Sequence, residues 1–284
     1  MMSEQTKPLT DWIGSQEVRE EIISGVVADG VAAMLDMDGE RFANGDPLPS
    51  LWHWFHFLPK APMSRIDHDG HPKRGGFFPP VTLPRRMFAG ARMKFLHPLI
   101  IGQPAVREGE ILNVSEKSGK SGNLVFVTAR YRIRQNNELC VEEEQDIVYK
   151  DDGPPVPAPV PLSAHPDPGP NVWVRDVTPN TVLLFRFSAL TFNAHRIHYD
   201  RPYAMKEEGY PGLVVHGPLV ALMLLEMTRS HSGKKIAGFT FQGRAPLFDL
   251  HPFRLIGRPN GHTVELEAHG PHGKTTMSAS AELA

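Results

Sequence analysis

The chain has 284 residues with a formal net charge of −2, and 40% of them are hydrophobic while 22% are charged. This composition is typical of a globular protein with a substantial core, and it excludes extensive disorder. Because the charge is nearly balanced, no global basic field exists that would attract nucleic acid or an anionic membrane.

The sequence also limits the compartment in which we expect the protein. A single cysteine, Cys140, cannot form an internal disulfide. The first residues lack the basic and then apolar layout of a signal peptide. The longest apolar stretch, residues 219–227, is interrupted by Glu226 and is much shorter than the roughly 20 residues of a membrane span. We therefore expect a soluble cytoplasmic protein.

The first element along the chain is predicted from its apolar spacing. Val18, Ile22 and Val26 recur at helical intervals, Ser15 could cap the first turn, and glutamates lie near that positive end. We predict a helix over residues 17–35.

Further along the first half, residues 123–134 alternate between apolar and polar side chains, as a half-buried strand does. The amide-rich residues 135–137 predict a turn, and residues 140–149 predict the returning strand. A β-hairpin therefore closes the first half.

Proline and small residues dominate residues 153–170, which predicts a semi-rigid extended spacer. The halves on either side echo one another, because Leu96-His97-Pro98-Leu99-Ile100-Ile101-Gly102 returns as Leu250-His251-Pro252-Phe253-Arg254-Leu255-Ile256-Gly257 with one insertion. We predict two similar domains, residues 1–152 and 171–284, joined by a linker at 153–170.

In the second half, residues 218–231 predict a helix with Pro218 at its first position, where a missing N–H has no cost. Apolar residues occur on nearly all of its faces, so the helix should be buried. Four strands are predicted to follow, over residues 238–245, 253–256, 263–269 and 275–282. The fold class is therefore α+β.

Four polar side chains between positions 193 and 200 are the first candidates for chemistry: Asn193, His195, His198 and Asp200. Histidine gains or loses a proton near neutral pH, and an amide can hold a water without competing for that proton. Hydration of an α,β-unsaturated thioester needs both functions, because water loses a proton as it attacks Cβ and a proton must reach Cα.

Gly217, directly before Pro218, is the second candidate. The unpaired N–H groups at the start of a helix can stabilise the enolate oxygen that develops during hydration, and glycine lets that oxygen approach the backbone. A metal centre is the alternative chemistry: His198 and Asp200 with a distant His251 or His262 imitate an iron triad, and His195 with His198 imitates a zinc pair.

Two long segments carry a resemblance to a known family, namely residues 185–200 and 209–219. They resemble the MaoC-like branch of the hot-dog superfamily, and nearest to them are the double-hot-dog mesaconyl-C4-CoA and itaconyl-CoA hydratases and the mitochondrial-type 3-hydroxyacyl-thioester dehydratases. Segments of the first half resemble the same subgroup: Asp11-Trp12-Ile13-Gly14, Leu51-Trp52-His53-Trp54-Phe55, Asp69-Gly70-His71-Pro72-Lys73-Arg74-Gly75-Gly76-Phe77 and Leu83-Pro84-Arg85-Arg86-Met87.

The resemblance implies a tandem, or double, hot-dog fold in which each antiparallel sheet wraps around a helix. It implies a degenerate first domain that accommodates the acyl or coenzyme A part of the substrate, and a catalytic second domain. The implied reaction is the reversible hydration of a branched C5 dicarboxylic enoyl-CoA, mesaconyl-C4-CoA or itaconyl-CoA, to citramalyl-CoA. A fatty 3-hydroxyacyl-thioester dehydratase and a non-catalytic acyl-CoA-binding protein are the alternatives.

The resemblance also assigns roles to residues. It places His198 at the catalytic histidine and Gly217 at the oxyanion glycine, whereas Asn193 stands where the family has an aspartate. An amide is not a base, so either His198 carries most of the proton transfer while Asn193 holds the water, or Asp200 or His195 takes the lost role.

The remaining predictions concern substrate contacts and partners. A carboxylated acyl group calls for an arginine, and the candidates are Arg85, Arg86 and Arg196. Other predicted substrate contacts are Tyr199, Asp200, Val215 and His216. Coenzyme A phosphates could meet Lys73 and Arg74, or Lys234 and Lys235. We expect no metal and no cofactor besides the coenzyme A of the substrate, and a monomer or a homodimer.

Overall fold

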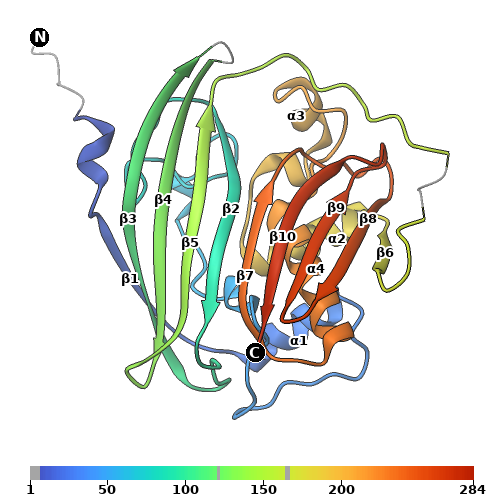
Figure 1. Cartoon of the computed structure of the whole chain (residues 1–284). Helices are drawn as coiled ribbons and strands as arrows, with labels where there is room; N and C mark the ends of the chain where they lie inside the picture. The colour runs from blue at the N-terminus through green and yellow to red at the C-terminus, as the bar shows by residue number, and fades with distance from the viewer. Residues whose placement is uncertain (1–6, 120–121, 164–166) are drawn as a thin grey trace, which may run out of the picture.

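The computed structural model describes residues 7–119, 122–163 and 167–284. Its centre is one antiparallel sheet of ten strands in the order β1-β3-β4-β5-β2-β7-β10-β9-β8-β6 (Figure 1). The first half supplies β1 (Gln16–Ile22), β2 (Arg85–Phe95), β3 (Pro104–Gly119), β4 (Gly122–Gln135) and β5 (Glu138–Lys150). The second half supplies β6 (Trp173–Val177), β7 (Ile236–Gly243), β8 (Phe253–Asn260), β9 (Thr263–His269) and β10 (Thr275–Leu283).

The two halves repeat one topology. The order in the first half is β1-β3-β4-β5-β2, and the second half has the equivalent order β6-β8-β9-β10-β7. The halves join where β2 pairs with β7, so the two sheets become one. The echoed segments that begin at Leu96 and Leu250 both follow the second strand of their half, as expected for a tandem duplication.

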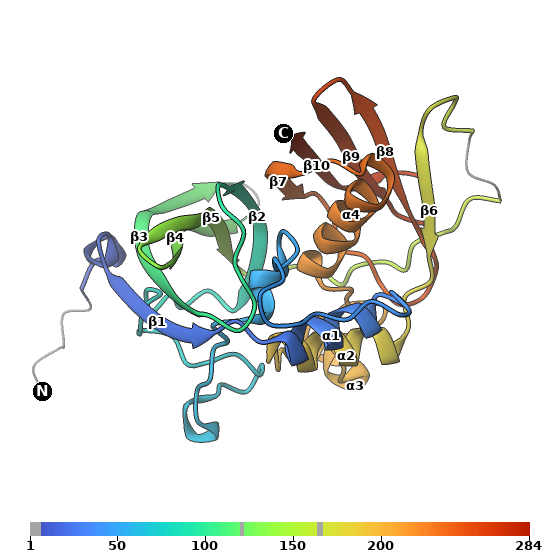
Figure 2. The ribbon, with the colours of Figure 1, turned by 90° about the horizontal axis from the view of Figure 1, so that it is seen from below.

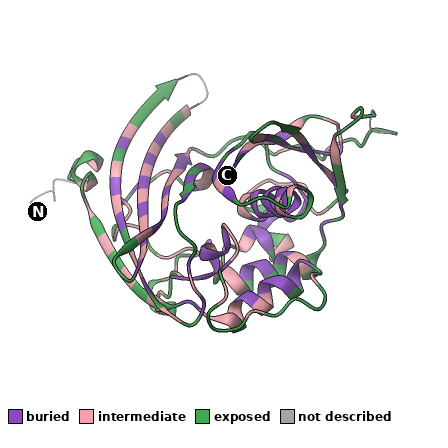
Figure 3. Cartoon of the chain, turned by 60° about the horizontal axis from the view of Figure 1, so that its bottom comes forward, coloured by how far each residue is buried: buried purple, intermediate pink, exposed green. Residues whose placement is uncertain are grey.

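The helices are α1 (Gly25–Met34), α2 (Thr181–Thr191), α3 (Arg201–Lys206) and α4 (Gly217–Ser232), with 3₁₀ turns η1 (Leu9–Trp12), η2 (Trp52–Phe55), η3 (Met63–Arg65) and η4 (Arg196–His198). The second half of the sheet curves around α4 (Figure 2). The helix predicted over residues 218–231 is confirmed, and all residues from Leu219 to Thr228 are buried (Figure 3).

The prediction of a helix over residues 17–35 is wrong for the first part of this segment. This segment forms the edge strand β1 and, after a break at Ser24, the helix α1. Val18 and Ile22 are four positions apart, an even number, so a strand also places them on one face. They lie on the outer face, 63% and 62% exposed, while the alternate charged residues face inward.

The other strands predicted from alternation are confirmed. The segments at 123–134 and 140–149 lie within β4 and β5, and Asn136 and Asn137 form the turn between them with φ of 51° and 64°. The four strands predicted after α4 correspond to β7, β8, β9 and β10. Strand β7 begins two residues earlier than predicted, and β8 continues to Asn260 because the pairing with β9 extends to that residue.

The proline-rich spacer contains no helix or strand in its described residues, 153–163 and 167–170. It is nevertheless held in place, because Val156 N donates to Gly209 O at 2.8 Å and Leu162 N donates to Pro271 O at 2.9 Å. Among the described residues, none of the helices has the length and apolar character needed to cross a membrane.

The halves also meet away from the sheet. Trp52 of η2 donates its indole N–H to Glu226 of α4 at 2.7 Å, and one apolar core includes residues from both halves. In the described first half, only short 3₁₀ turns and loops lie between α1 and β2. No counterpart of the 16-residue α4 stands there, and a large cavity opens beside these loops.

Candidate active site

The cavity has a volume of about 1810 Å³ and is lined by residues of both halves. Typical small-molecule sites measure roughly 300–1,000 Å³, so this one has room for a long ligand. Three residues predicted to be catalytic, Asn193, His198 and Gly217, all line it. The residues predicted for catalysis and for binding the acyl group are therefore gathered at one place, except for Asp200.

His198 ends the η4 turn and is buried. Its Nδ1 lies 2.7 Å from the carbonyl oxygen of Val214, which can only accept a hydrogen bond. Nδ1 must therefore carry the proton, and Nε2 keeps a free lone pair. Burial lowers the pKa of His198 to about 4, so the ring is neutral near pH 7 and is able to accept a proton.

His198 belongs to a row of histidine rings that crosses the site. The His216 ring stacks on it with centroids 3.5 Å apart, and His195 meets it edge-on at 5.6 Å. His216 Nε2 also contacts Ser188 Oγ at 2.9 Å. Burial and the neighbouring imidazoles lower the pKa of both His195 and His216, so the row is uncharged near neutral pH.

Gly217 is the first residue of α4, and His216 precedes it as the N-cap. The first N–H groups of a helix have no partner within the helix, and they lie at the positive end of its dipole. A Cβ built on Gly217 would meet nothing nearer than Met277 Cε, at 4.0 Å. The space beside this helix start is therefore open to a ligand oxygen.

Asn193 follows the end of α2, where Phe192 adopts a left-handed conformation with φ of 51°. Its Oδ1 accepts a hydrogen bond from His195 N at 3.0 Å, and its backbone N donates to Ser188 O at 2.8 Å. The side-chain oxygen is thus used to shape the loop, which leaves the amide NH₂ to interact with a ligand.

Two of the other predicted residues engage each other. Arg196 forms an ion pair with Asp200 at 2.7 Å, and its guanidinium lies over the Tyr203 ring at 4.2 Å. Asp200 also caps α3 by accepting from Tyr203 N. Asp200 is therefore occupied, and the geometry gives it no access to the role that an aspartate at position 193 would have.

Tyr199 and Val215 each make a hydrogen bond to a backbone carbonyl oxygen near the site. The Tyr199 hydroxyl donates to Ala194 O at 3.1 Å, and Val215 N donates to Leu247 O at 2.8 Å. Both residues line the cavity, and they hold the segments that carry His198 and Gly217.

The two neighbouring arginines of β2 differ in their partners. Arg85 is buried, binds Asp152 at 3.0 Å and lies 3.9 Å from Glu208. Arg86 lies over the rings of Phe78 and Tyr149, and no described carboxylate pairs with it. Arg86 lines the same cavity as His71 and His195, and its charge adds to the effect of burial in lowering the pKa of both histidines.

The lysines and arginine considered for coenzyme A phosphates lie in two places. Lys73 and Arg74 line the cavity, although Arg74 donates to the carbonyl oxygens of Val81, Leu83 and Pro84. Lys234 and Lys235 follow α4 and lie outside the cavity lining. Of the two pairs, only Lys73 and Arg74 therefore lie where a ligand inside this cavity can contact them.

Reasoning from the sequence missed two residues of this site, Asp69 and His71. They come from a loop of the first half, and Asp69 O accepts the N–H of Arg196 at 2.9 Å. They form, with His195, a group whose potential metal-binding atoms lie within 4.8 Å of one another. No other such group occurs in the described ranges, so the triads imagined around His198, Asp200 and His251 or His262 are not formed.

The buried histidines predict an acid-sensitive fold. A neutral buried imidazole whose pKa lies below that of the unfolded chain contributes stability that is complete above about pH 6.5 and is lost as the pH falls. Because the pKa of His198 is lowered to about 4, this residue alone should reduce the free energy of unfolding by about 2 kcal/mol when the pH falls from 7.5 to 5. Urea unfolding at the two pH values measures this change. An unfolding free energy that is equal or larger at pH 5 would contradict it, and His198→Asn should reduce the pH dependence.

Comparisons with known proteins agree with this geometry. Residues 51–249 match the family model described as hydroxyacyl-thioester dehydratase type 2. The chain is 59% identical over 272 residues to the mesaconyl-C(4)-CoA hydratase of Chloroflexus aurantiacus, covering 96% of each chain. It is 29% identical over 240 residues to the mitochondrial hydroxyacyl-thioester dehydratase type 2 of Schizosaccharomyces pombe, covering 74% of this chain and 78% of the relative.

The fold of the chain is also similar to solved structures. The crystal structure of HtdX of Mycobacterium tuberculosis superposes with a TM-score of 0.66 at 16% identity, covering 95% of this chain and 100% of that one. A second Mycobacterium tuberculosis structure, described as a double hot-dog fold, superposes with a TM-score of 0.52 at 13% identity, covering 98% of each chain. The predicted double hot-dog fold is therefore confirmed. The family match spans more than half of the chain, and the hydratase similarity extends almost from end to end. The chain thus belongs to the hydroxyacyl-thioester dehydratase type 2 family and is a hydro-lyase.

Proposed function

We propose that this chain reversibly hydrates the double bond of a branched C5 dicarboxylic enoyl-CoA, mesaconyl-C4-CoA or itaconyl-CoA, to citramalyl-CoA. The observation that carries the proposal is Arg86, a cation that has no described carboxylate partner and lines the same cavity as the histidine row. The high identity to a mesaconyl-C(4)-CoA hydratase supports the same substrate class.

In the proposed reaction, His198 Nε2 takes a proton from water while the water oxygen bonds to Cβ. The fixed Nδ1–H tautomer of His198 leaves this nitrogen free for the proton. The π electrons move to the thioester oxygen, which lies at the start of α4 beside Gly217 and is stabilised there by backbone N–H groups. The imidazolium then returns its proton to Cα, and Asn193 holds the water through its amide group.

The distal carboxylate of the acyl group pairs with Arg86 in this arrangement. Arginine is well suited to this role, because its planar fork donates two hydrogen bonds to a carboxylate. The aromatic rings of Phe78 and Tyr149 hold the guanidinium without neutralising its charge. Arg85 is less suitable, because Asp152 and Glu208 already surround it.

Replacing Arg86 should therefore change selectivity more than turnover. We expect Arg86→Leu to lower kcat/KM for mesaconyl-C4-CoA by roughly 10²-fold, the effect of about 3 kcal/mol for a lost charged hydrogen bond. Turnover of crotonyl-CoA, which has no second carboxylate, should change by less than about threefold. A loss of absorbance in the enoyl-thioester band measures both substrates. Equal losses for both would contradict the assignment of Arg86.

Dehydration of a fatty 3-hydroxyacyl thioester is the second candidate function. The family match and the apolar side chains on the cavity wall, such as Phe77 and Phe88, favour it. Comparing crotonyl-CoA and longer enoyl-CoA esters with the dicarboxylic esters decides between the two. Tight binding of every ester without turnover would instead indicate an acyl-CoA-binding protein.

The proposal needs no cofactor besides the coenzyme A of the substrate. Lys73 and Arg74, at the cavity wall, are the proposed contacts of its phosphates. We propose that the protein acts in the cytoplasm, without nucleic-acid or membrane partners. Because one chain supplies both halves of the sheet, either a monomer or a homodimer contains a complete site.

A further inference from the structure

A tight turn of the first half is locked against the segment that carries His198. Arg196 N donates to Asp69 O at 2.9 Å, and the Arg196 guanidinium donates to His68 O at 3.2 Å. Gly70 has φ of 94°, and a Cβ there would lie 1.8 Å from Ala194 O. Only glycine fits both the conformation and the contact. The side chains of Asp69 and His71 are thus held at the candidate site.

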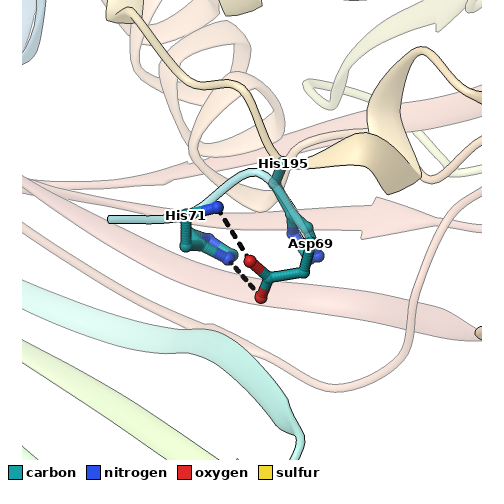
Figure 4. Close-up of side chains that lie close together, drawn as sticks. All are labelled: Asp69, His71 and His195. Carbon is teal, nitrogen blue, oxygen red and sulfur yellow. Dashed lines mark hydrogen bonds and ion pairs between the residues drawn. The ribbon is translucent and has the colours of Figure 1, made fainter. Parts of the chain in front are cut away.

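Asp69 fixes the tautomer of His71 (Figure 4). Its Oδ1 accepts the backbone N–H of His71 at 2.8 Å, and its Oδ2 lies 3.0 Å from His71 Nδ1. Burial alone would raise the pKa of Asp69, but its hydrogen bonds to the ring and backbone of His71 hold it well below its usual value. An ionised carboxylate only accepts, so Nδ1 carries the proton and Nε2 of His71 has a free lone pair.

The His71 ring lies next to the row of histidines described above. Its centroid is 4.1 Å from that of His195, and the His195 ring is 5.6 Å from that of His198. His71 lines the same cavity as His198. After burial, a charge on His71 is a further cause that lowers the pKa of His198, so the two rings are close enough to act on each other across the cavity.

We propose that Asp69 and His71 form a second water-holding pair of the active site, which replaces the carboxylate that Asn193 lacks. This inference rests on the proposed hydration. The attacking water donates one hydrogen to His198 Nε2 and the other to His71 Nε2. As the oxygen bonds to Cβ, the first proton moves to His198 and later returns to Cα. The second hydrogen stays on the new hydroxyl group, and His71 remains neutral throughout.

Asp69→Asn tests this role with a small change of shape. The backbone N–H of His71 can only donate, so the single oxygen of the introduced amide stays with it and the amide NH₂ group faces the ring. His71 must then protonate Nε2, which removes the acceptor for water. We expect kcat to fall by roughly 10²-fold, in the range of other groups that handle a reacting proton, with KM nearly unchanged.

A neighbouring pair with the same chemistry provides the matched control. Asp67 Oδ1 accepts the backbone N–H of His68 at 2.8 Å and lies 3.3 Å from its ring Nδ1, but the His68 side chain is 80% exposed. We expect Asp67→Asn to retain kcat within about twofold of the wild type. This control separates the position of Asp69 from a general effect of removing a carboxylate from the loop.

Three further measurements keep the inference independent of folding. Imidazole ¹⁵N shifts should assign a proton to Nδ1 of His71 in the wild type and to Nε2 in Asp69→Asn. Added imidazole should restore part of the activity lost in His71→Ala. Protein treated with a chelator should retain full activity, because the proposal uses the Asp69 carboxylate and the nitrogens of His71 without a metal.

The outcomes separate this inference from the proposed function. A wild type that hydrates no enoyl-CoA contradicts the proposed function itself. A wild type that is active while Asp69→Asn matches Asp67→Asn overturns only the role of Asp69 and His71. An unchanged His71 tautomer in Asp69→Asn, failed rescue of His71→Ala by imidazole, or activity abolished by the chelator also overturns that role.

Discussion

His198→Ala should reduce kcat for the favoured enoyl-CoA by roughly 10³-fold, within the range of about 10²–10⁴ for a general acid–base group. The reason is that His198 is the proposed carrier of the proton between water and Cα. Its Nε2 is free only because Val214 O holds Nδ1–H at 2.7 Å. Steady-state rates measured with purified variants check the loss.

His231→Ala is the matched control for this variant. His231 follows the buried part of α4, and its Nδ1 contacts a backbone carbonyl oxygen, Met227 O, at 2.8 Å, as His198 does with Val214. It lies outside the cavity lining. We expect its kcat to stay within about twofold of the wild type. Wild-type turnover in His198→Ala would remove the basis of the proposed mechanism.

Gly217→Val should abolish most activity while leaving the fold intact. A Cβ at this position meets only Met277 Cε at 4.0 Å, so the added side chain extends into open space at the start of α4. That space is where the thioester oxygen must approach the N–H groups. We expect kcat to fall by roughly 10²–10³-fold, the effect of losing one such donor. The melting temperature should change little.

Gly76→Val controls for simple crowding of the cavity. Gly76 also lines the cavity, and an added Cβ there meets nothing within 4 Å. A bulky side chain at this wall should at most raise KM, and we expect kcat to stay within about threefold of the wild type. If both valine variants lower kcat equally, the special role of the helix start is refuted.

Local sequence was sufficient to propose the candidate residues near α4. His198 and Gly217 were predicted because a helix start, a glycine and closely spaced polar residues all lie within one short segment. The helix itself was predictable because it is apolar on all sides, and it is buried accordingly. Such features depend on neighbours in the sequence, so they can be recognised without the fold.

The contribution of the first half could not be found in this way. Asp69 meets the segment before His198 through contacts that span more than a hundred positions, and no local period signals them. The partners of the two arginines could not be predicted from the sequence either. Arg85 and Arg86 are neighbours in the sequence, but strand alternation directs Arg85 to Asp152 and Glu208 and Arg86 to the aromatic rings.

The wrong first part of the helix predicted over residues 17–35 has a different cause. Residues four apart share one face in a helix and in a strand alike, so Val18 and Ile22 could not distinguish the two. What decides the structure is pairing with β3, in which Glu17 also binds Arg107 at 2.9 Å. That partner lies far along the chain, and only the three-dimensional fold brings it to the strand.

The addition of water to an enoyl thioester is the central claim, and isotope incorporation tests it most directly. Purified protein is incubated with mesaconyl-C4-CoA in H₂¹⁸O, and the product is analysed by mass spectrometry. We predict a hydroxyacyl-CoA that carries one ¹⁸O atom, formed by the wild type and almost absent with His198→Ala. An unchanged substrate, or a product without ¹⁸O, would contradict the claim.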